Sequence, residues 1–137
     1  MKLIVALLIL GCIVSLSSGQ WVETTVPLPD SMPGLAEIRV MQYHPNNHSM
    51  YVAGGYGLLV VDAATRQKTA RLELPGTPRF LCSSPASNKL YCASLYARPV
   101  WVVDCATNSL RATVTVDSGF KDMCYAGAVN KLYVACP

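Results

Sequence analysis

A block of about forty residues recurs along this chain, and the recurrence limits the folds that the chain can adopt. Three segments align in register, residues 39–53, 79–93 and 121–135. In this alignment Tyr51, Tyr91 and Tyr133 fall 40 and 42 residues apart. A second pair of segments, 58–65 and 100–107, repeats with an offset of 42. Because two separate segments share one period, we expect the chain to repeat one structural unit.

Each unit is predicted to form four short antiparallel strands. In the second unit these strands cover residues 80–83, 89–93, 100–104 and 110–116, and breaker residues separate them. The third strand is continuously apolar, which indicates burial on both faces. The fourth alternates polar and apolar residues, which indicates one wet face. The predicted fold class is therefore all-β, with tandem four-stranded antiparallel meanders packed face to face.

Residues 1–19 are predicted to be a signal peptide. Lys2 precedes an apolar run from Leu3 to Leu16, and Ser17-Ser-Gly19 supplies small residues for cleavage before Gln20. The apolar run is too short to span a bilayer, so no transmembrane segment is expected. An alternative is lipidation at Cys12, because Ile9-Leu-Gly-Cys12 loosely resembles a bacterial lipobox. The predicted location is secreted, periplasmic or at the cell surface.

The charge distribution argues against a nucleic-acid partner. Charged residues make up 14% of the chain and the net charge is +3, with Lys and Arg scattered singly rather than clustered. Nucleic-acid binding normally requires a clustered basic face. The apolar fraction of 52% also excludes a disordered chain.

Five cysteines follow the predicted signal peptide, and their number is odd. At least one is therefore free, intermolecular or paired with a group outside this sequence. The spacing shows no C-x-x-C motif, which disfavours structural zinc. Cys82 and Cys92 flank one predicted hairpin, so a disulfide between them and a pair of buried thiols are both open.

The repeated unit resembles the YVTN-type β-propeller repeat of secreted and surface proteins of prokaryotes. The resemblance rests on Tyr43-His-Pro-Asn-Asn-His-Ser-Met-Tyr-Val-Ala53 and on Asn88-Lys-Leu-Tyr-Cys-Ala93 followed by Val102-Val-Asp-Cys-Ala-Thr-Asn108. It covers roughly residues 21–137 and implies propeller blades, but it says little about function because members share architecture more than activity. One departure is Gly127, which replaces the proline of the repeat.

The resemblance also implies a division of the mature chain, residues 20–137. We expect a lone outer strand at 21–31, blades at 38–76 and 78–118, and a partial blade at 120–137. A closed propeller needs four to eight blades, so we expect an incomplete ring and a chain truncated at its C-terminus. The rival expectation is a small protein that closes a ring by oligomerising.

The polar residues in the turns are predicted to be structural. Asp62 and Asp104 precede tight turns, where carboxylates accept hydrogen bonds from turn amides; metal binding or general-acid catalysis is the less favoured alternative. His44 and His48 lie around one turn and are not expected to bind metal. Asn47-His-Ser49 matches a glycosylation acceptor.

Aromatic residues offer a few candidate contacts. We expect Trp101 in the core, while Tyr96 beside Arg98 is the favoured exposed pair and Trp21 and Tyr125 are weaker candidates. No residue is predicted to be catalytic, cofactor-binding or metal-binding, and no cofactor is expected.

The predicted function is a non-catalytic, secreted module that binds or scaffolds a protein or glycan, with self-association through open blade faces as a further expectation. Two alternatives stay open. One is a fragment of a propeller lactonase or quinoprotein-type oxidoreductase, and the other is a part of a surface-layer or adhesion protein.

Overall fold

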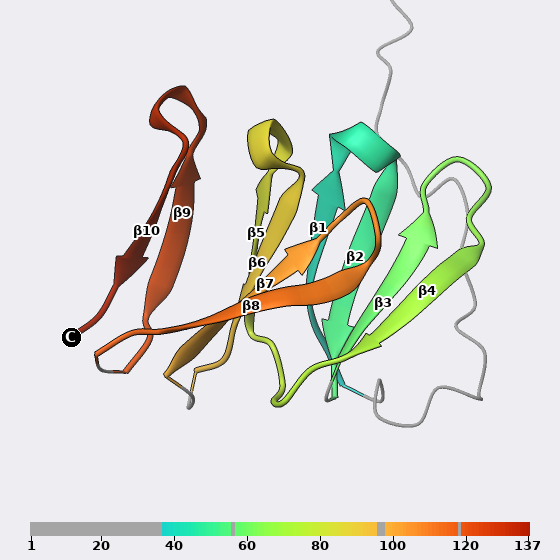
Figure 1. Ribbon diagram of the computed structural model, residues 1–137. Helices are drawn as coiled ribbons and strands as arrows, with labels where there is room; N and C mark the ends of the chain where they lie inside the picture. The colour runs from blue at the N-terminus through green and yellow to red at the C-terminus, as the bar shows by residue number, and fades with distance from the viewer. Residues whose placement is uncertain (1–36, 56, 96–97, 118) are drawn as a thin grey trace, which may run out of the picture.

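The computed structural model describes residues 37–55, 57–95, 98–117 and 119–137, which form three antiparallel sheets standing side by side (Figure 1). We call them blade 1, blade 2 and blade 3. Blade 1 contains β1 (Ile38–His44), β2 (Ser49–Gly54), β3 (Gly57–Asp62) and β4 (Lys68–Glu73). Blade 2 contains β5 (Phe80–Ser84), β6 (Lys89–Ala93), β7 (Pro99–Asp104) and β8 (Ser109–Thr115). Blade 3 contains β9 (Asp122–Ala126) and β10 (Lys131–Ala135).

Within each sheet the strands pair in chain order, as in a meander. The expected all-β fold of tandem four-stranded blades is confirmed, and the sheets do not close into a ring. The division into a signal peptide, a lone strand at 21–31 and a repeat domain stays a prediction, because residues 1–36 lie outside the described residues.

The turn between the first two strands of each blade has one geometry throughout. Three residues form a single 3₁₀ turn (Pro45–Asn47, Pro85–Ser87 and Gly127–Val129), and the next residue adopts a left-handed backbone. That residue is His48, Asn88 or Asn130, with φ between 50° and 52°. Its backbone N–H donates to the carbonyl three residues earlier. Gly127 therefore replaces proline without changing the turn, since asparagine tolerates the left-handed conformation.

The third strands are buried as predicted. Leu58, Leu59 and Val60 of β3 are fully buried, and Val100 to Val103 of β7 are at most 7% exposed. The prediction for the fourth strand of blade 2 was wrong in one respect, because every residue of β8 is exposed rather than one face only. Leu72 in β4 packs against blade 2 and is 7% exposed, whereas its repeat equivalent Val114 is 52% exposed. The two strands of blade 3 do not cover β8.

Blades 1 and 2 are joined by an apolar core with a polar seam at one end. One apolar cluster contains side chains of both blades. Blade 1 contributes Leu58, Val60 and Leu72, and blade 2 contributes Leu90, Cys92, Trp101, Val103 and Cys105. The seam centres on Tyr51, whose hydroxyl donates to Asn108 Oδ1 at 2.7 Å and accepts from Asn47 Nδ2 at 3.1 Å. Asn47 Nδ2 also donates to the carbonyl of Cys105 at 2.8 Å. These bonds satisfy the polar side chains of the seam itself.

Blades 2 and 3 meet through aromatic contacts. Phe80 and Phe120 lie with ring centroids 5.0 Å apart, and Tyr91 stacks on Tyr125 at 6.4 Å. Phe120 is 1% exposed and belongs to a cluster that also contains Ala93 and Val100. The interface between blades 2 and 3 is thus formed by the same two kinds of sheet face as the interface between blades 1 and 2, shifted by one repeat.

Candidate binding surfaces

The two repeated aspartates are held in their turns. Asp62 Oδ1 accepts from the backbone N–H groups of Ala64 and Thr65 at 2.9 and 2.7 Å. Asp104 Oδ1 accepts from the corresponding groups of Ala106 and Thr107 at 2.9 and 3.3 Å. The backbone hydrogen bond from Thr65 is the main reason why the pKa of Asp62 lies below its ordinary value. Both carboxylates therefore have the turn-capping contacts that the sequence analysis favoured.

The two histidines are also engaged, and they do not converge. His44 is fully buried between blades 1 and 2, with Nδ1 2.7 Å from Ser83 Oγ and Nε2 2.8 Å from Asn88 Oδ1. Asn88 Oδ1 can only accept, so Nε2 carries a proton. His48 is exposed, and its Nδ1 lies 3.0 Å from the Tyr43 hydroxyl. Within the described ranges, no group of three or more His, Cys, Asp or Glu side chains is placed to hold a metal ion.

A disulfide between Cys82 and Cys92 is ruled out by strand register. Cys82 of β5 pairs with Tyr91, while Cys92 of β6 pairs with Leu81. Paired residues share a face and neighbouring residues alternate, so the two thiols point to opposite sides of blade 2. The five described cysteines are all free. Burial is the main cause that raises the pKa values of Cys82, Cys92 and Cys105.

The aromatic candidates are placed as follows. Trp101 is 1% exposed, as expected for a core residue. Tyr125 stacks on Tyr91 and donates its hydroxyl proton to Asn130 Oδ1 at 2.7 Å, so it contributes to blade packing. Trp21 and Tyr96 lie outside the described residues. Arg98 is exposed, and its carbonyl accepts from Val116 N–H at 3.2 Å.

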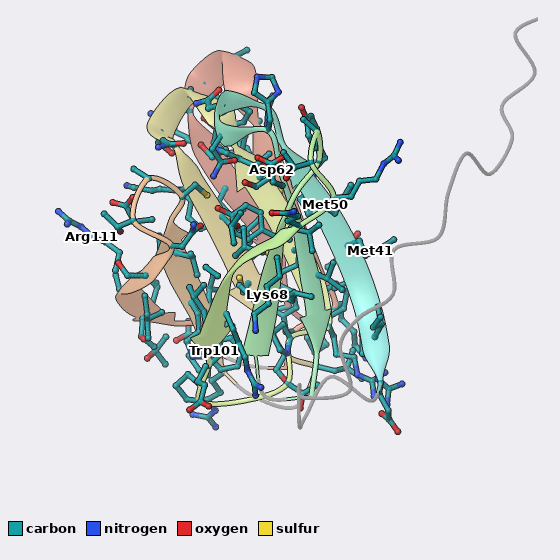
Figure 2. All side chains as sticks on the ribbon, turned by 90° about the vertical axis from the view of Figure 1, so that its right-hand side faces the viewer. Met41, Met50, Asp62, Lys68, Trp101 and Arg111 are labelled. Carbon is teal, nitrogen blue, oxygen red and sulfur yellow. The ribbon has the colours of Figure 1, made fainter. Side chains whose placement is uncertain are left out.

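An apolar groove lies on the face of blade 1 that points away from blade 2. Its volume is about 320 Å³, and it is lined by Ile38, Met41, Met50, Val52, Val61, Asp62, Ala63 and Arg66. Figure 2 looks toward this side of the molecule and shows Met41, Met50 and Asp62 across β1, β2 and the end of β3. Met41 is 60% exposed and Ile38 48%, whereas Val52 and Val61 form the buried floor. We call this surface the end groove.

The end groove was not predicted from the sequence. The signal was present in the repeat, because Met41, Met50 and Val52 align with Leu81, Leu90 and Cys92 of the next unit. Those three residues pack against blade 1. Apolar residues at the same positions in the first unit therefore indicate a sheet face suited to packing against another surface.

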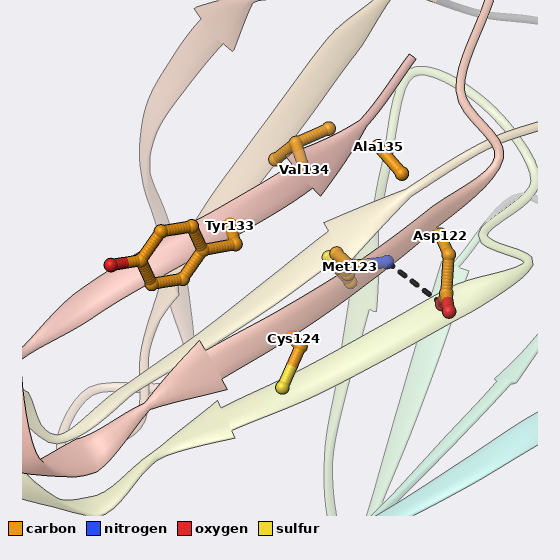
Figure 3. A pocket seen from close by; sticks show the side chains of 6 residues that line it. All are labelled: Asp122, Met123, Cys124, Tyr133, Val134 and Ala135. Atoms are coloured by element: carbon orange, nitrogen blue, oxygen red, sulfur yellow. Dashed lines mark hydrogen bonds between the residues drawn. The ribbon is translucent and has the colours of Figure 1, made fainter. Parts of the chain in front are cut away.

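A second surface is the face of blade 3 that points away from blade 2. A shallow hollow of about 200 Å³ lies here, lined by Asp122, Met123, Cys124, Tyr133, Val134 and Ala135. The side chains of Met123 and Val134 themselves pack toward blade 2, whereas the other four lie on the outer face. Figure 3 shows Cys124 and Tyr133 on the neighbouring strands β9 and β10, where they pair directly. Tyr133 is 57% exposed, and Val129 at the adjoining turn is 55% exposed. We call this surface the open face of blade 3.

Comparisons with known proteins identify the fold. No protein-family model and no curated protein sequence matches the chain. Among solved structures, the chain is similar to Kuenenia stuttgartiensis Hydrazine Synthase, with 20% identity and a TM-score of 0.66 over 85% of this chain and 33% of that one. It is also similar to the β-propeller domain of Myceliophteria_thermophila Cps50 (Swd1), with 12% identity and a TM-score of 0.54 over 64% of this chain and 28% of that one.

The chain thus spans about a third of the length of these structures, and identities this low show the fold alone. In the part of the chain that the structure describes, no helix is long and apolar enough to cross a membrane. The described residues form an open run of β-propeller blades.

Proposed function

We propose that this chain is a secreted, non-catalytic β-propeller module of the YVTN-repeat type that binds a protein partner. Secretion is supported by the charged, apolar and small-residue segments of residues 1–19. The repeat type is supported by the turns that begin at Pro45 and Pro85 and by the Val-Val-Asp motifs that end at Asp62 and Asp104, which recur with the period of the blades.

The end groove is the observation that carries the binding role. Apolar side chains dominate its lining, and two of them are methionines, whose flexible thioethers adapt to varied apolar partners. Its polar residues, Asp62 and Arg66, lie together at the end of the groove that adjoins the β3–β4 turn. An apolar polypeptide segment suits this lining better than a glycan, since sugar hydroxyls need several polar partners.

A non-catalytic role is supported by the way in which the reactive side chains are used. The carboxylates of Asp62 and Asp104 cap turns, and both ring nitrogens of His44 bond across the interface between blades 1 and 2. These contacts place the groups in structural roles and leave them poorly positioned for proton transfer to a substrate.

Arrayed peptides and arrayed glycans test the proposal when each is probed with the fluorescently labelled chain. We expect apolar peptides to bind, Met41→Asp to abolish this binding, and Arg111→Asp to leave it unchanged. Arg111 lies on the exposed strand β8, far from Met41 in Figure 2. Binding of glycans alone, or peptide binding that Met41→Asp does not weaken, would refute the proposed function.

A further inference from the structure

The end groove has a counterpart inside the molecule. The face of blade 2 that packs on blade 1 contains six residues of the shared core, namely Leu81, Leu90, Cys92, Trp101, Val103 and Cys105. One repeat earlier, the same positions are Met41, Met50, Val52, Leu59, Val61 and Ala63. Five of these line the end groove, and the sixth, Leu59, is buried beneath it in a cluster with Val52 and Val61. The groove is therefore the repeat equivalent of a surface that, one unit later, is covered by another blade.

The open face of blade 3 is the equivalent of the covering surface. In blade 1 that surface presents Tyr51 and Ala53, both fully buried against blade 2. Their equivalents in blade 3 are Tyr133 and Ala135, which line the hollow on the open face. Tyr133 is 57% exposed, where Tyr51 is not exposed at all. The chain thus carries both halves of an interface that it already makes internally.

We propose that the open face of blade 3 of one copy docks on the end groove of a second copy, in the way that blade 1 docks on blade 2. This inference rests on the proposed function, in which the groove binds polypeptide, and it names the partner as the chain itself. Such a contact is heterologous, because each copy contributes a different surface. Head-to-tail assembly then follows, as a ring where the rotation closes and as a filament where it does not.

The polar seam of the internal interface also has a counterpart. Arg66 stands at the repeat position of Asn108, and both residues have a left-handed backbone, with φ of 63° and 50°. The hydroxyl of Tyr133 can accept from a guanidinium N–H, where the hydroxyl of Tyr51 donates to the Asn108 amide oxygen. The hydrogen bond between copies would thus form at the same position as the internal one, with Tyr133 as the acceptor where Tyr51 is the donor.

Two replacements make the contact between copies weaker than the internal one. Val129 stands where Asn47 donates to a backbone carbonyl across the interface, and Ala126 stands where His44 bonds to blade 2. Blade 3 also contributes two strands where blade 1 contributes four. We therefore expect reversible association, with a dissociation constant on the order of 1–100 µM.

Sedimentation velocity over a range of concentrations tests this inference, with reductant present because Cys124 and Cys136 are exposed. The expected result is association that Met41→Asp and Tyr133→Asp each abolish and that Arg111→Asp leaves intact. All three side chains are exposed, so the variants should fold, and far-UV circular dichroism checks this.

Mixing the two interface variants gives the sharper readout. The Met41→Asp copy keeps its open face and the Tyr133→Asp copy keeps its groove, so an equimolar mixture should form dimers that cannot grow. A mixture that stays monomeric while the unmodified chain associates would overturn the inference, and so would association that neither variant affects.

A chain that is monomeric at every concentration also overturns the inference. This holds whether or not the N-terminal residues of the same chain cover the groove. If that monomer still binds arrayed peptides through Met41, the proposed function stands and only the self-association fails. If it binds no peptide, both fail.

Discussion

Replacing Tyr51 with phenylalanine removes one hydroxyl from the seam between blades 1 and 2 while the ring stays in place. The hydroxyl donates to Asn108 Oδ1 and accepts from Asn47 Nδ2. Asn47 keeps a partner, because its Nδ2 also donates to the carbonyl of Cys105. Asn108 Oδ1 loses this donor at a site where Tyr51 is fully buried. We expect the free energy of unfolding to fall by about 1–3 kcal/mol, because the partly buried Asn108 is left without this hydrogen-bond donor.

The chain supplies its own control for this substitution. Tyr133 occupies the same repeat position but is 57% exposed, so Tyr133→Phe should change stability by less than about 0.5 kcal/mol in dilute protein. Urea unfolding followed by circular dichroism measures both variants. With a slope of about 2 kcal/mol/M, Tyr51→Phe should lower the unfolding midpoint by roughly 0.5–1.5 M.

A double-mutant cycle with Asn108→Gly isolates the bond itself. Glycine suits the left-handed backbone of Asn108, where φ is 50°, so the cycle adds little backbone strain. We expect a coupling energy of about 1 kcal/mol between the two positions. Equal losses for the Tyr51 and Tyr133 variants, or a coupling energy near zero, would refute the hydrogen-bonding argument.

Four further predictions follow. Gly57→Ala should destabilise the chain by about 3 kcal/mol or more in the same urea assay, because the new Cβ would lie 2.4 Å from the Leu72 carbonyl oxygen; unchanged stability would contradict the observed strand approach. Maleimide should label the exposed thiols of Cys124 and Cys136 within minutes and the buried thiols only on unfolding, as peptide mass spectrometry can show; early labelling of a buried thiol would count against the blade packing. Burial raises the pKa values of Tyr51 and of the Cys92 and Cys105 thiols above their ordinary values of 10.0 and 9.0. At high pH the unfolded chain therefore releases these protons before the folded chain does. The contribution of these groups to the free energy of unfolding is complete below about pH 9 and declines at higher pH. Unfolding at a series of pH values checks this, and a stability that rises above pH 9 would contradict it. Finally, the exported chain should begin at Gln20 in intact-mass measurement, and retention of residues 1–19 would argue against the predicted signal peptide.

Strand positions could be predicted because they depend on local patterns. The apolar run of residues 100–103 within β7 lacks breakers, and the residues around Pro85 and Asn88 restrict the backbone to a turn. The predicted strands of blade 2 differ from β5, β6, β7 and β8 by one residue at most at either end. The structural roles of Asp62 and Asp104 were also predictable, because a carboxylate two or three residues before turn amides can bond to them without any distant partner.

Which side chains face one another depends on the register of strand pairing, and which strands are buried depends on the neighbouring blades. A shift of one residue in the pairing of β5 with β6 would have placed Cys82 opposite Cys92, and no local pattern in the hairpin excludes that shift. The exposure of β8 likewise depends on a neighbouring blade rather than on its own residues, since its sequence alternates as β4 does.

Local residue patterns are enough to specify the repeated meander, its turns and the burial of its third strands, since each follows from residues within a few positions of one another. Which faces of the blades are covered depends instead on how the blades pack. Burial of a sheet face requires a second surface at a fixed distance, and the supply of that surface depends on how many blades stack. For this reason the end groove and the open face of blade 3 emerged from the packing, although the residues that form them belong to the repeat.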